Sequence, residues 1–347
     1  MSAPSSDSRT PVTVITGFLG AGKTTLVNHL LNQLGPDDGG RNYAIIVNEF
    51  GDIGIDGALI DTGPEELIEL SSGCLCCVVR GDLIRTLRDL LTIRPNLAGV
   101  LIETTGLANP SPVIQTLVVD QVIAAQCRLD SVVCVTDAAH LDQQLADSTD
   151  AAEQIVFADH VILNKTDAAA PGQVEALGAR IAALNPFARI TPATRGKVAA
   201  SQVLGRDAFS LERLPRDLLE DGAASPAEEP HDHDHAHGHD HIAQSGITSV
   251  SLTLDAAVDP DRLESWLTDL LSRHGADILR TKGIFAVPGE ARRLVIQAVN
   301  MMLEGDFAGP WGDAPRLSRL VFIGRRLDRA TLSAGLAACA ALDPSAS

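Results

Sequence analysis

Three cysteines, Cys74, Cys76 and Cys77, occur within four positions of the stretch SSGCLCCVVRGD at 71–82. Thiolates are good ligands for zinc, Cu(I) and similar soft or borderline ions. Adjacent Cys76 and Cys77 are too strained for an ordinary disulfide, whereas the C-x-x-C spacing of Cys74 and Cys77 suits a tetrahedral ion. With Cys76 as the third ligand, one position stays open for water, Glu49, a histidine or an incoming ligand. We therefore predict an exchangeable metal site; a redox pair and a packed turn are the alternatives.

A glycine-rich loop, GFLGAGKTT at 17–25, follows a predicted strand and opens a predicted helix. In its pattern G-x-x-x-x-G-K-T, the glycines let backbone N–H groups curl around phosphate oxygens at a helix N-terminus. Lys23 would reach the β- and γ-phosphates, and the Thr24 hydroxyl would ligate Mg²⁺. The stretch predicts a nucleoside triphosphate site rather than a chance match. The predicted binding residues are Gly17, Gly20, Ala21, Gly22, Lys23, Thr24 and Thr25.

The tetrapeptide NKTD at 164–167 directly follows another predicted strand. A carboxylate here accepts hydrogen bonds from N1–H and the exocyclic amine of guanine, a pair of donors that adenine lacks. Asp167 would therefore select GTP, while Asn164 and Lys165 would support the loop and cover the base. A turn held by its own polar side chains is the alternative. The position downstream of a phosphate loop favours guanine binding.

The stretch LIETTG at 101–106 ends a further predicted strand. Glu103 is placed where a carboxylate orients water or assists the Mg²⁺ of a phosphate-transfer site. Gly106 would let the backbone approach the γ-phosphate. A solvated carboxylate at a strand end is the alternative.

The stretch VNEFGDIGID at 47–56 places Glu49, Asp52 and Asp56 among glycines. A segment of this kind can change its order with the presence of the γ-phosphate. The pattern does not indicate which carboxylate positions the attacking water. The predicted catalytic residues are Lys23, Thr24, Glu103 and Asp52, and the predicted metal ligands are Cys74, Cys76, Cys77, Glu49 and, for Mg²⁺, Thr24.

These residues require a scaffold of parallel strands. Between 12 and 205, continuous apolar runs alternate with amphipathic stretches. Such runs suit strands that are buried on both faces of a parallel sheet. We predict an α/β fold, a doubly wound and mostly parallel sheet of the P-loop NTPase type. The predicted strands are 12–17, 43–48, 98–103, 131–136 and 159–165, and the predicted helices are 22–34, 81–93, 110–126, 138–157 and 171–184.

Composition changes on either side of this domain, so we predict four regions. Residues 1–11 are expected to be disordered, and 12–205 carry the nucleotide and metal motifs. Residues 206–246 are charged and rich in Pro, Gly and Ala, and they include HDHDHAHGHDH at 231–241. We interpret them as a flexible linker whose imidazoles collect metal ions; a solvated low-complexity linker is the alternative. Residues 247–342 are predicted to form a small α+β domain, with strands at 247–254, 277–287, 293–300 and 319–325 and helices at 260–274 and 328–342.

Overall charge excludes some partners. Lys plus Arg total 27 and Asp plus Glu total 45, so the net charge is −18. Nucleic acid and anionic membranes demand a basic face, so neither is expected as a main partner. No apolar run approaches the ~20 residues of a membrane-spanning helix, and the start of the chain lacks the apolar region of a secretory signal.

We expect a cytoplasmic protein with reduced thiols. Isolated cysteines in apolar runs are predicted core residues: Cys127, Cys134 and Cys339.

The motifs together resemble those of CobW-type GTPases, metallochaperones of the SIMIBI class of P-loop GTPases that include zinc-regulated GTPase metalloprotein activators. The matches are GFLGAGKTTL, VNEFGDIGID, GCLCC, LIETTG and NKTD, in that order, and ILRTKGIFAV and LVFIGRRLD resemble the CobW C-terminal domain. The likeness covers about 12–340. It implies Mg²⁺-dependent GTP hydrolysis coupled to delivery of a metal, usually zinc, to client metalloproteins. It also implies that Cys74, Cys76 and Cys77 hold that metal.

Three functional hypotheses follow. In the first, GTP orders segment 49–56 and completes a tight cysteine site that hydrolysis loosens; cobalt for cobalamin synthesis remains an alternative to zinc. In the second, the chain is a metal store or sensor with uncoupled GTPase activity, as the histidine run would suit. In the third, it phosphorylates a small molecule, which guanine selection by NKTD argues against. The sequence does not indicate the oligomeric state or the client. The eleven residues before Val12 carry no convincing version of the proline-centred docking motif of some eukaryotic relatives.

Overall fold

The computed structural model describes residues 7–34, 42–48, 67–70, 77–106, 109–209 and 246–341. Most of the predicted linker and the first six residues lie outside these ranges. The chain divides into two compact units. The first holds Met1–Gln144, Ala158–Ala179 and Ala188–Phe209, and the second holds Leu145–Phe157, Arg180–Phe187 and Ser210–Ser347.

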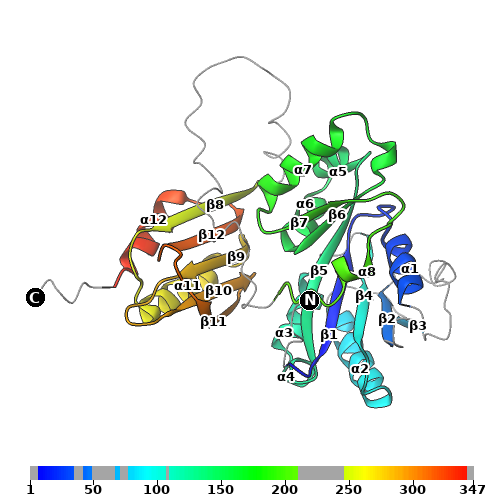
Figure 1. The fold of residues 1–347 in the computed structure, drawn as a ribbon, viewed down its shortest axis with the longest axis horizontal. Helices are drawn as coiled ribbons and strands as arrows, with labels where there is room; N and C mark the ends of the chain where they lie inside the picture. The colour runs from blue at the N-terminus through cyan, green and yellow to red at the C-terminus, as the bar shows by residue number, and fades with distance from the viewer. Residues whose placement is uncertain are drawn as a thin grey trace, which may run out of the picture. The chain divides into compact units, whose positions relative to one another are not determined.

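The first unit is built on a seven-stranded sheet in the order β3-β2-β4-β1-β5-β6-β7 (Figure 1). Every pair of neighbouring strands in it is parallel, which confirms the predicted α/β architecture. The strand order reverses at β1, with β2 and β4 on one side of it and β5 and β6 on the other. A ligand crevice is therefore expected at the carboxyl end of β1. The strands are β1 (Thr10–Thr16), β2 (Tyr43–Asn48), β3 (Leu67–Leu70), β4 (Gly99–Glu103), β5 (Cys127–Asp137), β6 (His160–Asn164) and β7 (Arg189–Pro192).

Two helices predicted as single elements are each divided. The predicted helix 110–126 is interrupted at Asp120, whose carboxylate accepts hydrogen bonds from the N–H groups of the next helix. The predicted helix 138–157 is interrupted at Ser148, whose hydroxyl accepts from the N–H of Asp150. These short polar side chains favour helix starts over helix interiors. The helices are α1 (Lys23–Gln33), α2 (Cys77–Ile93), α3 (Ser111–Val119), α4 (Gln121–Ala124), α5 (Leu141–Asp147), α6 (Thr149–Phe157), α7 (Gln173–Leu184) and α8 (Ala200–Val203).

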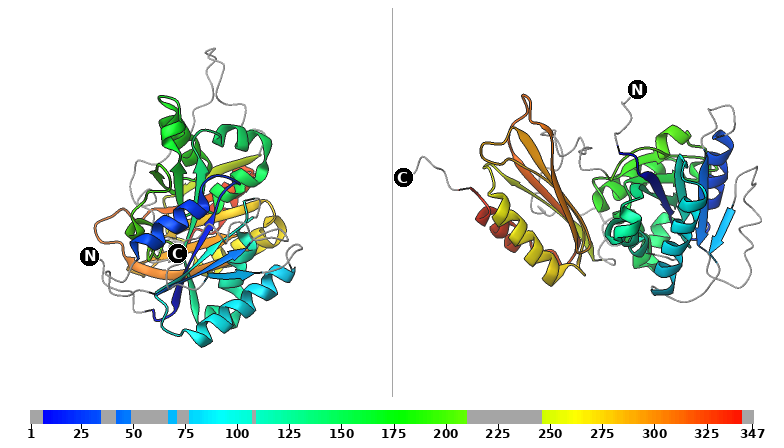
Figure 2. Two further views of the ribbon diagram at one scale, coloured as in Figure 1. Left: turned by 90° about the vertical axis from the view of Figure 1, so that its right-hand side faces the viewer. Right: turned by 90° about the horizontal axis from the view of Figure 1, so that it is seen from below.

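The core on one face of this sheet joins α1 to the central strands. Leu26 and Leu30 of α1, which are spaced by one turn, are fully buried against Ile15, Val133 and Val135. Apolar side chains spaced by four residues lie on the same side of a helix and form its apolar stripe. Helices α2, α3 and α4 contact one another on the opposite face (Figure 2). The two layers hold the carboxyl end of β1 in a fixed position.

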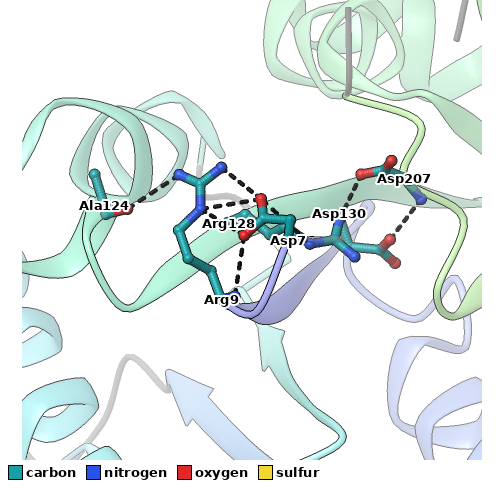
Figure 3. Close-up of polar contacts among 6 residues, drawn as sticks. All are labelled: Asp7, Arg9, Ala124, Arg128, Asp130 and Asp207. Atoms are coloured by element: carbon teal, nitrogen blue, oxygen red, sulfur yellow. Dashed lines mark hydrogen bonds and ion pairs between the residues drawn. The ribbon is translucent and has the colours of Figure 1, made fainter. Parts of the chain in front are cut away.

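The amino end of β5 holds a polar cluster around Asp130 (Figure 3). The carboxylate accepts from the Thr13 hydroxyl at 3.0 Å and from the backbone N–H of Asp207 at 2.6 Å. Arg128 forms an ion pair with the Asp207 side chain. Burial raises the pKa of Asp130 above its ordinary 3.8, and the hydrogen bonds it accepts offset only part of that rise. The cluster therefore anchors the chain where it leaves the first domain.

The first described residues are held at the same amino end of β5. Arg9 pairs with Asp7, and its guanidinium also donates to the carbonyl of Ala124 at 3.1 Å. Figure 3 shows these groups beside Arg128. Three separate segments of the chain thus meet at the amino end of β5.

The second unit contains a five-stranded antiparallel sheet in the order β11-β10-β9-β12-β8. Helix α11 is capped by Asp259, whose carboxylate accepts from two N–H groups of the first turn, and it buries Leu263, Leu267 and Leu271. Helices α11 and α12 cover the same face of the sheet (Figure 2). The elements are β8 (Ile247–Leu254), α11 (Pro260–His274), β9 (Ile278–Phe285), β10 (Arg292–Val299), β11 (Met302–Pro310), β12 (Ser318–Arg325) and α12 (Arg329–Ala338).

Strand β11 is a correction to the predicted elements of this domain. It follows β10 through a two-residue turn in which Asn300 has a left-handed φ of 51°. The glycines and the proline of MLEGDFAGP conceal its strand character, and its edge position tolerates them. None of the helices in the described ranges has the length and hydropathy needed to cross a membrane.

Candidate functional site

The phosphate loop lies at the carboxyl edge of the first sheet, between β1 and α1. Its glycines have backbone conformations that L-residues rarely adopt, with φ of 139° at Gly17 and 103° at Gly22. A Cβ at Gly17 would lie 2.1 Å from the carbonyl oxygen of Val135, and one at Gly22 would lie 2.5 Å from Nδ2 of Asn164. Gly20 also has a positive φ, of 75°. The loop can therefore form only with glycine at Gly17 and Gly22, whereas at Gly20 the positive φ favours glycine without a steric clash.

Lys23, Thr24 and Glu103 are brought together by this loop and by β4. The Lys23 ammonium donates to the carbonyl of Gly17 at 2.9 Å and lies within 3.4 Å of that of Phe18. The Thr24 hydroxyl donates to Oε1 of Glu103 at 2.9 Å, because β4 is the neighbour of β1 in the sheet. A hydroxyl and a carboxylate oxygen side by side are the hard donors that Mg²⁺ prefers. The arrangement provides a cation for phosphates and oxygen ligands for a divalent metal.

The other predicted loop residues line the same edge. Gly106 lies against the loop backbone, since a Cβ there would lie 2.7 Å from both N and Cα of Leu19. Ala21 is buried and Thr25 is exposed at the start of α1. The first N–H groups of α1 have no partners within the helix, so they can bind anionic oxygens.

Asn164 joins the phosphate loop to the loops that follow β6 and β7. Its amide donates to the carbonyl of Ala21 at 2.9 Å, and its carbonyl accepts from the N–H of Gly196 at 2.9 Å. Asp167 lies on the short 3₁₀ turn Thr166–Ala168 and is exposed. Its carboxylate can therefore accept donors from a base edge. The four residues of NKTD thus start from a rigid point at the end of β6.

Lys165 is held by a carboxylate that the sequence analysis did not select. Its Nζ lies 2.9 Å from Oδ2 of Asp137, the last residue of β5. Asp137 also accepts from the N–H of Ala139 and contacts Nδ1 of His140 at 3.0 Å. Burial alone would raise the pKa of Asp137, but the hydrogen bonds from Lys165, His140 and Ala139 hold it below its ordinary 3.8. This carboxylate is therefore ionised beside the predicted base site.

The segment ATRGK at 193–197 is a second component that sequence reasoning missed. Backbone and side chain of Thr166 both donate to the carbonyl of Ala193, at 3.2 and 3.1 Å. The hydroxyls of Thr166 and Thr194 are 3.0 Å apart. The available signal was a polar, glycine-containing stretch directly after the strand that follows NKTD. This segment supports the tetrapeptide from the side of β7.

The predicted ligands of the cysteine site and the predicted catalytic Asp52 are not placed by the structure. Cys74, Cys76, Glu49 and Asp52 lie outside the described residues, and so does the side chain of Cys77, whose backbone begins α2. Within the described ranges, no group of three or more His, Cys, Asp or Glu residues could hold a metal ion. The cysteine site therefore stays a prediction.

The three isolated cysteines are buried, as predicted. Burial raises the pKa of Cys127 to about 11 and that of Cys134 to about 12, so both remain thiols at neutral pH. A protonated thiol is a poor metal ligand and a poor nucleophile. These residues belong to the core and do not compete with the clustered cysteines.

Comparison with known families agrees with this geometry. Residues 11–192 match the family described as "CobW/HypB/UreG, nucleotide-binding domain". Residues 247–340 match "Cobalamin synthesis protein cobW C-terminal domain". The chain belongs to the CobW family. Its phosphate loop, the Thr24–Glu103 pair and NKTD all lie within the residues that match the nucleotide-binding domain.

Similarity to individual members of the family extends over nearly the whole chain. The zinc chaperone YjiA of Escherichia coli is 34% identical over 94% of this chain and 97% of its own length. The zinc chaperone CobW of Pseudomonas aeruginosa is 38% identical over 93% of this chain and 89% of its own. The crystal structure of Zn(II)-bound YjiA GTPase from E. coli, 30% identical, matches with a TM-score of 0.71 over 96% of this chain and 99% of that one. A YjiA variant in which a glutamate and two consecutive cysteines are replaced by alanine is also Zn(II)-bound.

Proposed function

We propose that this chain is a GTP-hydrolysing metallochaperone that binds zinc at Cys74, Cys76 and Cys77 and transfers it to client metalloproteins. The observation that carries the proposal is the assembly at one sheet edge. A phosphate loop, a hydroxyl–carboxylate pair for Mg²⁺ and a guanine-type tetrapeptide meet in the same unit that carries the cysteine triplet. The names of the relatives, zinc chaperones and a GTPase, support the same function.

Each group at this edge has a defined role in the proposal. Lys23 binds the β- and γ-phosphates, and Thr24 with Glu103 holds Mg²⁺ and its water. Asp167 selects guanine through its exposed carboxylate. Asp52 is the further candidate for orienting the attacking water. Placement of Lys23, Thr24 and Glu103 before the nucleotide arrives lowers the cost of binding and of hydrolysis.

The proposed zinc site has fewer protein ligands than a tetrahedral zinc ion can bind. Three thiolates leave one tetrahedral position for Glu49, water or a group of the client. Helix α2 begins at Cys77, so the last proposed ligand is attached to an element that packs on the nucleotide domain. Nucleotide state and zinc state can then influence each other, reciprocally. Hydrolysis would loosen the site and release the ion to a client in the cytoplasm, where thiols stay reduced.

A metal competition titration tests the proposal. The protein without residues 231–241 is titrated with zinc against a chromophoric chelator, with Mg²⁺ plus a non-hydrolysable GTP analogue and again with GDP. We expect zinc affinity at least about tenfold higher with the analogue, within the usual range of coupling between two sites. A parallel cobalt titration separates the zinc chaperone from a cobalt chaperone for cobalamin synthesis.

Cysteine variants provide the control for this titration. Serine at Cys74, Cys76 and Cys77 should abolish the tightening, whereas Cys339→Ser should keep it. Cys339 is buried and its sulfur donates to the carbonyl of Gly335, a bond that a serine hydroxyl can also make. Equal zinc affinity with both nucleotides would contradict gating and favour a metal store or sensor with uncoupled GTPase activity.

A further inference from the structure

The carboxyl end of β5 holds a carboxylate, that of Asp137, which lies outside every motif of the sequence and pairs with Lys165 of NKTD. We infer that Asp137 is a positioning residue for guanine recognition, which acts by holding Lys165 and with it the NKTD loop. The inference rests on the proposed function, since it assigns a further residue to the same nucleotide site.

The register of the sheet places Asp137 between the two halves of that site. Asp137 is the strand partner of Asn164, and the N–H of Ala138 donates to the carbonyl of Asn164 at 2.8 Å. Two residues earlier on β5, the backbone of Val135 lies in contact distance of Gly17 at the start of the phosphate loop. A side chain at position 137 is therefore close to both the phosphate loop and the guanine loop.

Lys165 needs such support because of its backbone conformation. Its φ of 58° lies in the left-handed region, which is unfavourable for a residue with a Cβ. The ion pair with Asp137 offsets part of this cost. The exposed fractions of the two side chains differ, at 39% for Lys165 and 5% for Asp137. The ammonium is thus bound to a buried, fixed carboxylate instead of moving freely in water.

The carboxylate itself is fixed from two further sides. The N–H of Ala139 donates to Oδ1 at 2.9 Å, which leaves Oδ2 for Lys165 and the His140 ring. Only a small adjustment of the Asp137 side chain is compatible with all these contacts. The fixed position of the Asp137 carboxylate therefore fixes the position of the Lys165 ammonium.

The sequence spacing of NKTD gives this ion pair a purpose. Lys165 is two residues from Asp167, whose carboxylate must accept hydrogen bonds from guanine. If Asp137 were uncharged, the Lys165 ammonium would be free to pair with Asp167 and compete with the base. Asp137 thus keeps the cation away from the residue that reads guanine.

A double-mutant cycle tests the inference. Mg·GDP affinity is measured by calorimetry for wild type, Asp137→Asn, Lys165→Met and the double variant. We expect Asp137→Asn to weaken GDP binding by about tenfold, the usual effect of losing a hydrogen bond to a charged group. The double variant should bind about as well as Lys165→Met alone, since Asp137 acts through that residue. In GTP hydrolysis, Asp137→Asn should raise KM while kcat changes by less than about twofold.

Asp142→Asn is the matched control, because it neutralises an exposed aspartate on the following helix. It should bind GDP like wild type. Wild-type affinity in a folded Asp137→Asn variant would overturn the inference alone, and so would strictly additive effects of the two substitutions, which indicate a purely structural role. A wild-type protein that binds no guanine nucleotide would overturn the proposed function and the inference with it.

Discussion

Strand β5 carries a buried aspartate near each end, and the two have opposite pKa shifts. At the amino end, burial raises the pKa of Asp130. At the carboxyl end, the pKa of Asp137 is lowered although burial acts in the raising direction there too. The difference lies in the partners: Asp130 accepts mainly from a hydroxyl and backbone N–H groups, whereas Asp137 has a lysine ammonium. Burial decides one shift and a paired charge decides the other.

Two buried titratable groups at the amino end of the sheet, His160 and Cys127, also have pKa shifts governed by burial, as Asp130 does. His160, which begins β6 and is the strand partner of Val133, has a pKa lowered to about 4, mainly by burial. The Cys127 thiol has a pKa raised to about 11 by burial. All three shifts favour uncharged forms. The amino end of the sheet therefore holds these uncharged groups beside the ion pairs of Arg9 and Arg128, while the carboxyl end keeps the ionised Asp137 carboxylate beside the predicted base site.

The largest expected effect at the carboxyl end is that of Lys23→Ala. The substitution removes the ammonium that we propose binds the β- and γ-phosphates. GTP hydrolysis at saturating substrate should fall by about 10²–10³-fold, as when other donors to developing charge are removed. Phosphate release measures the rate, and thermal unfolding verifies that the fold is intact.

Arg85→Ala is the control for loss of a cation, because the Arg85 side chain is 73% exposed on α2. This variant should hydrolyse GTP like wild type. If Lys23→Ala retained the rate of Arg85→Ala, the catalytic assignment at this edge would be wrong.

A smaller effect should appear in the pH dependence of stability at the amino end. His160 has a folded-state pKa of about 4 against an ordinary 6.5, so the unfolded chain binds the proton first as the pH falls. Its stabilising contribution is complete above pH 6.5 and is lost as the pH drops toward 4, by up to about 3 kcal/mol. His160→Gln should lose that part of the pH dependence. Urea unfolding at several pH values measures the difference from wild type.

His274→Gln controls this comparison, since His274 is exposed at the end of α11. Its unfolding free energy should follow the wild-type pH profile. Parallel profiles for His160→Gln and wild type would show that the buried imidazole does not govern acid stability.

The sequence predicted the central strands well and the ends and edges of the sheet less well. The strand at 43–48 was predicted with its observed bounds. Strand β5 starts four residues before its predicted start, because Arg128 and Asp130 look unsuited to a buried strand until their partner Asp207 is known. Strands β3 and β7 were missed because they are short strands at the two sheet edges.

A similar division applies to the candidate site. Lys23, Thr24, Glu103 and Asn164 were predicted from local motifs, and the structure brings them together at one edge. Asp137 and the segment at 193–197 were missed, because their role depends on contacts between residues far apart in the sequence. Local patterns reveal groups that bind a ligand directly, whereas groups that position them become visible only when the strands are aligned.

The most direct test of the contrast between the two ends of β5 uses one substitution at both. Asp130→Ala leaves the Thr13 hydroxyl and the Asp207 N–H without their acceptor, so it should lower the free energy of unfolding by about 2 kcal/mol. Its GDP affinity should stay within about twofold of wild type, as expected for a distant site. Asp137→Ala should weaken GDP binding by about tenfold and cost about 1 kcal/mol of stability, because Lys165 and His140 can turn to water and only the Ala139 N–H loses its acceptor. The account would be contradicted if the two variants lost the same amounts of stability and GDP affinity. It would also be contradicted if Asp130→Ala mainly weakened GDP binding and Asp137→Ala mainly lowered the free energy of unfolding.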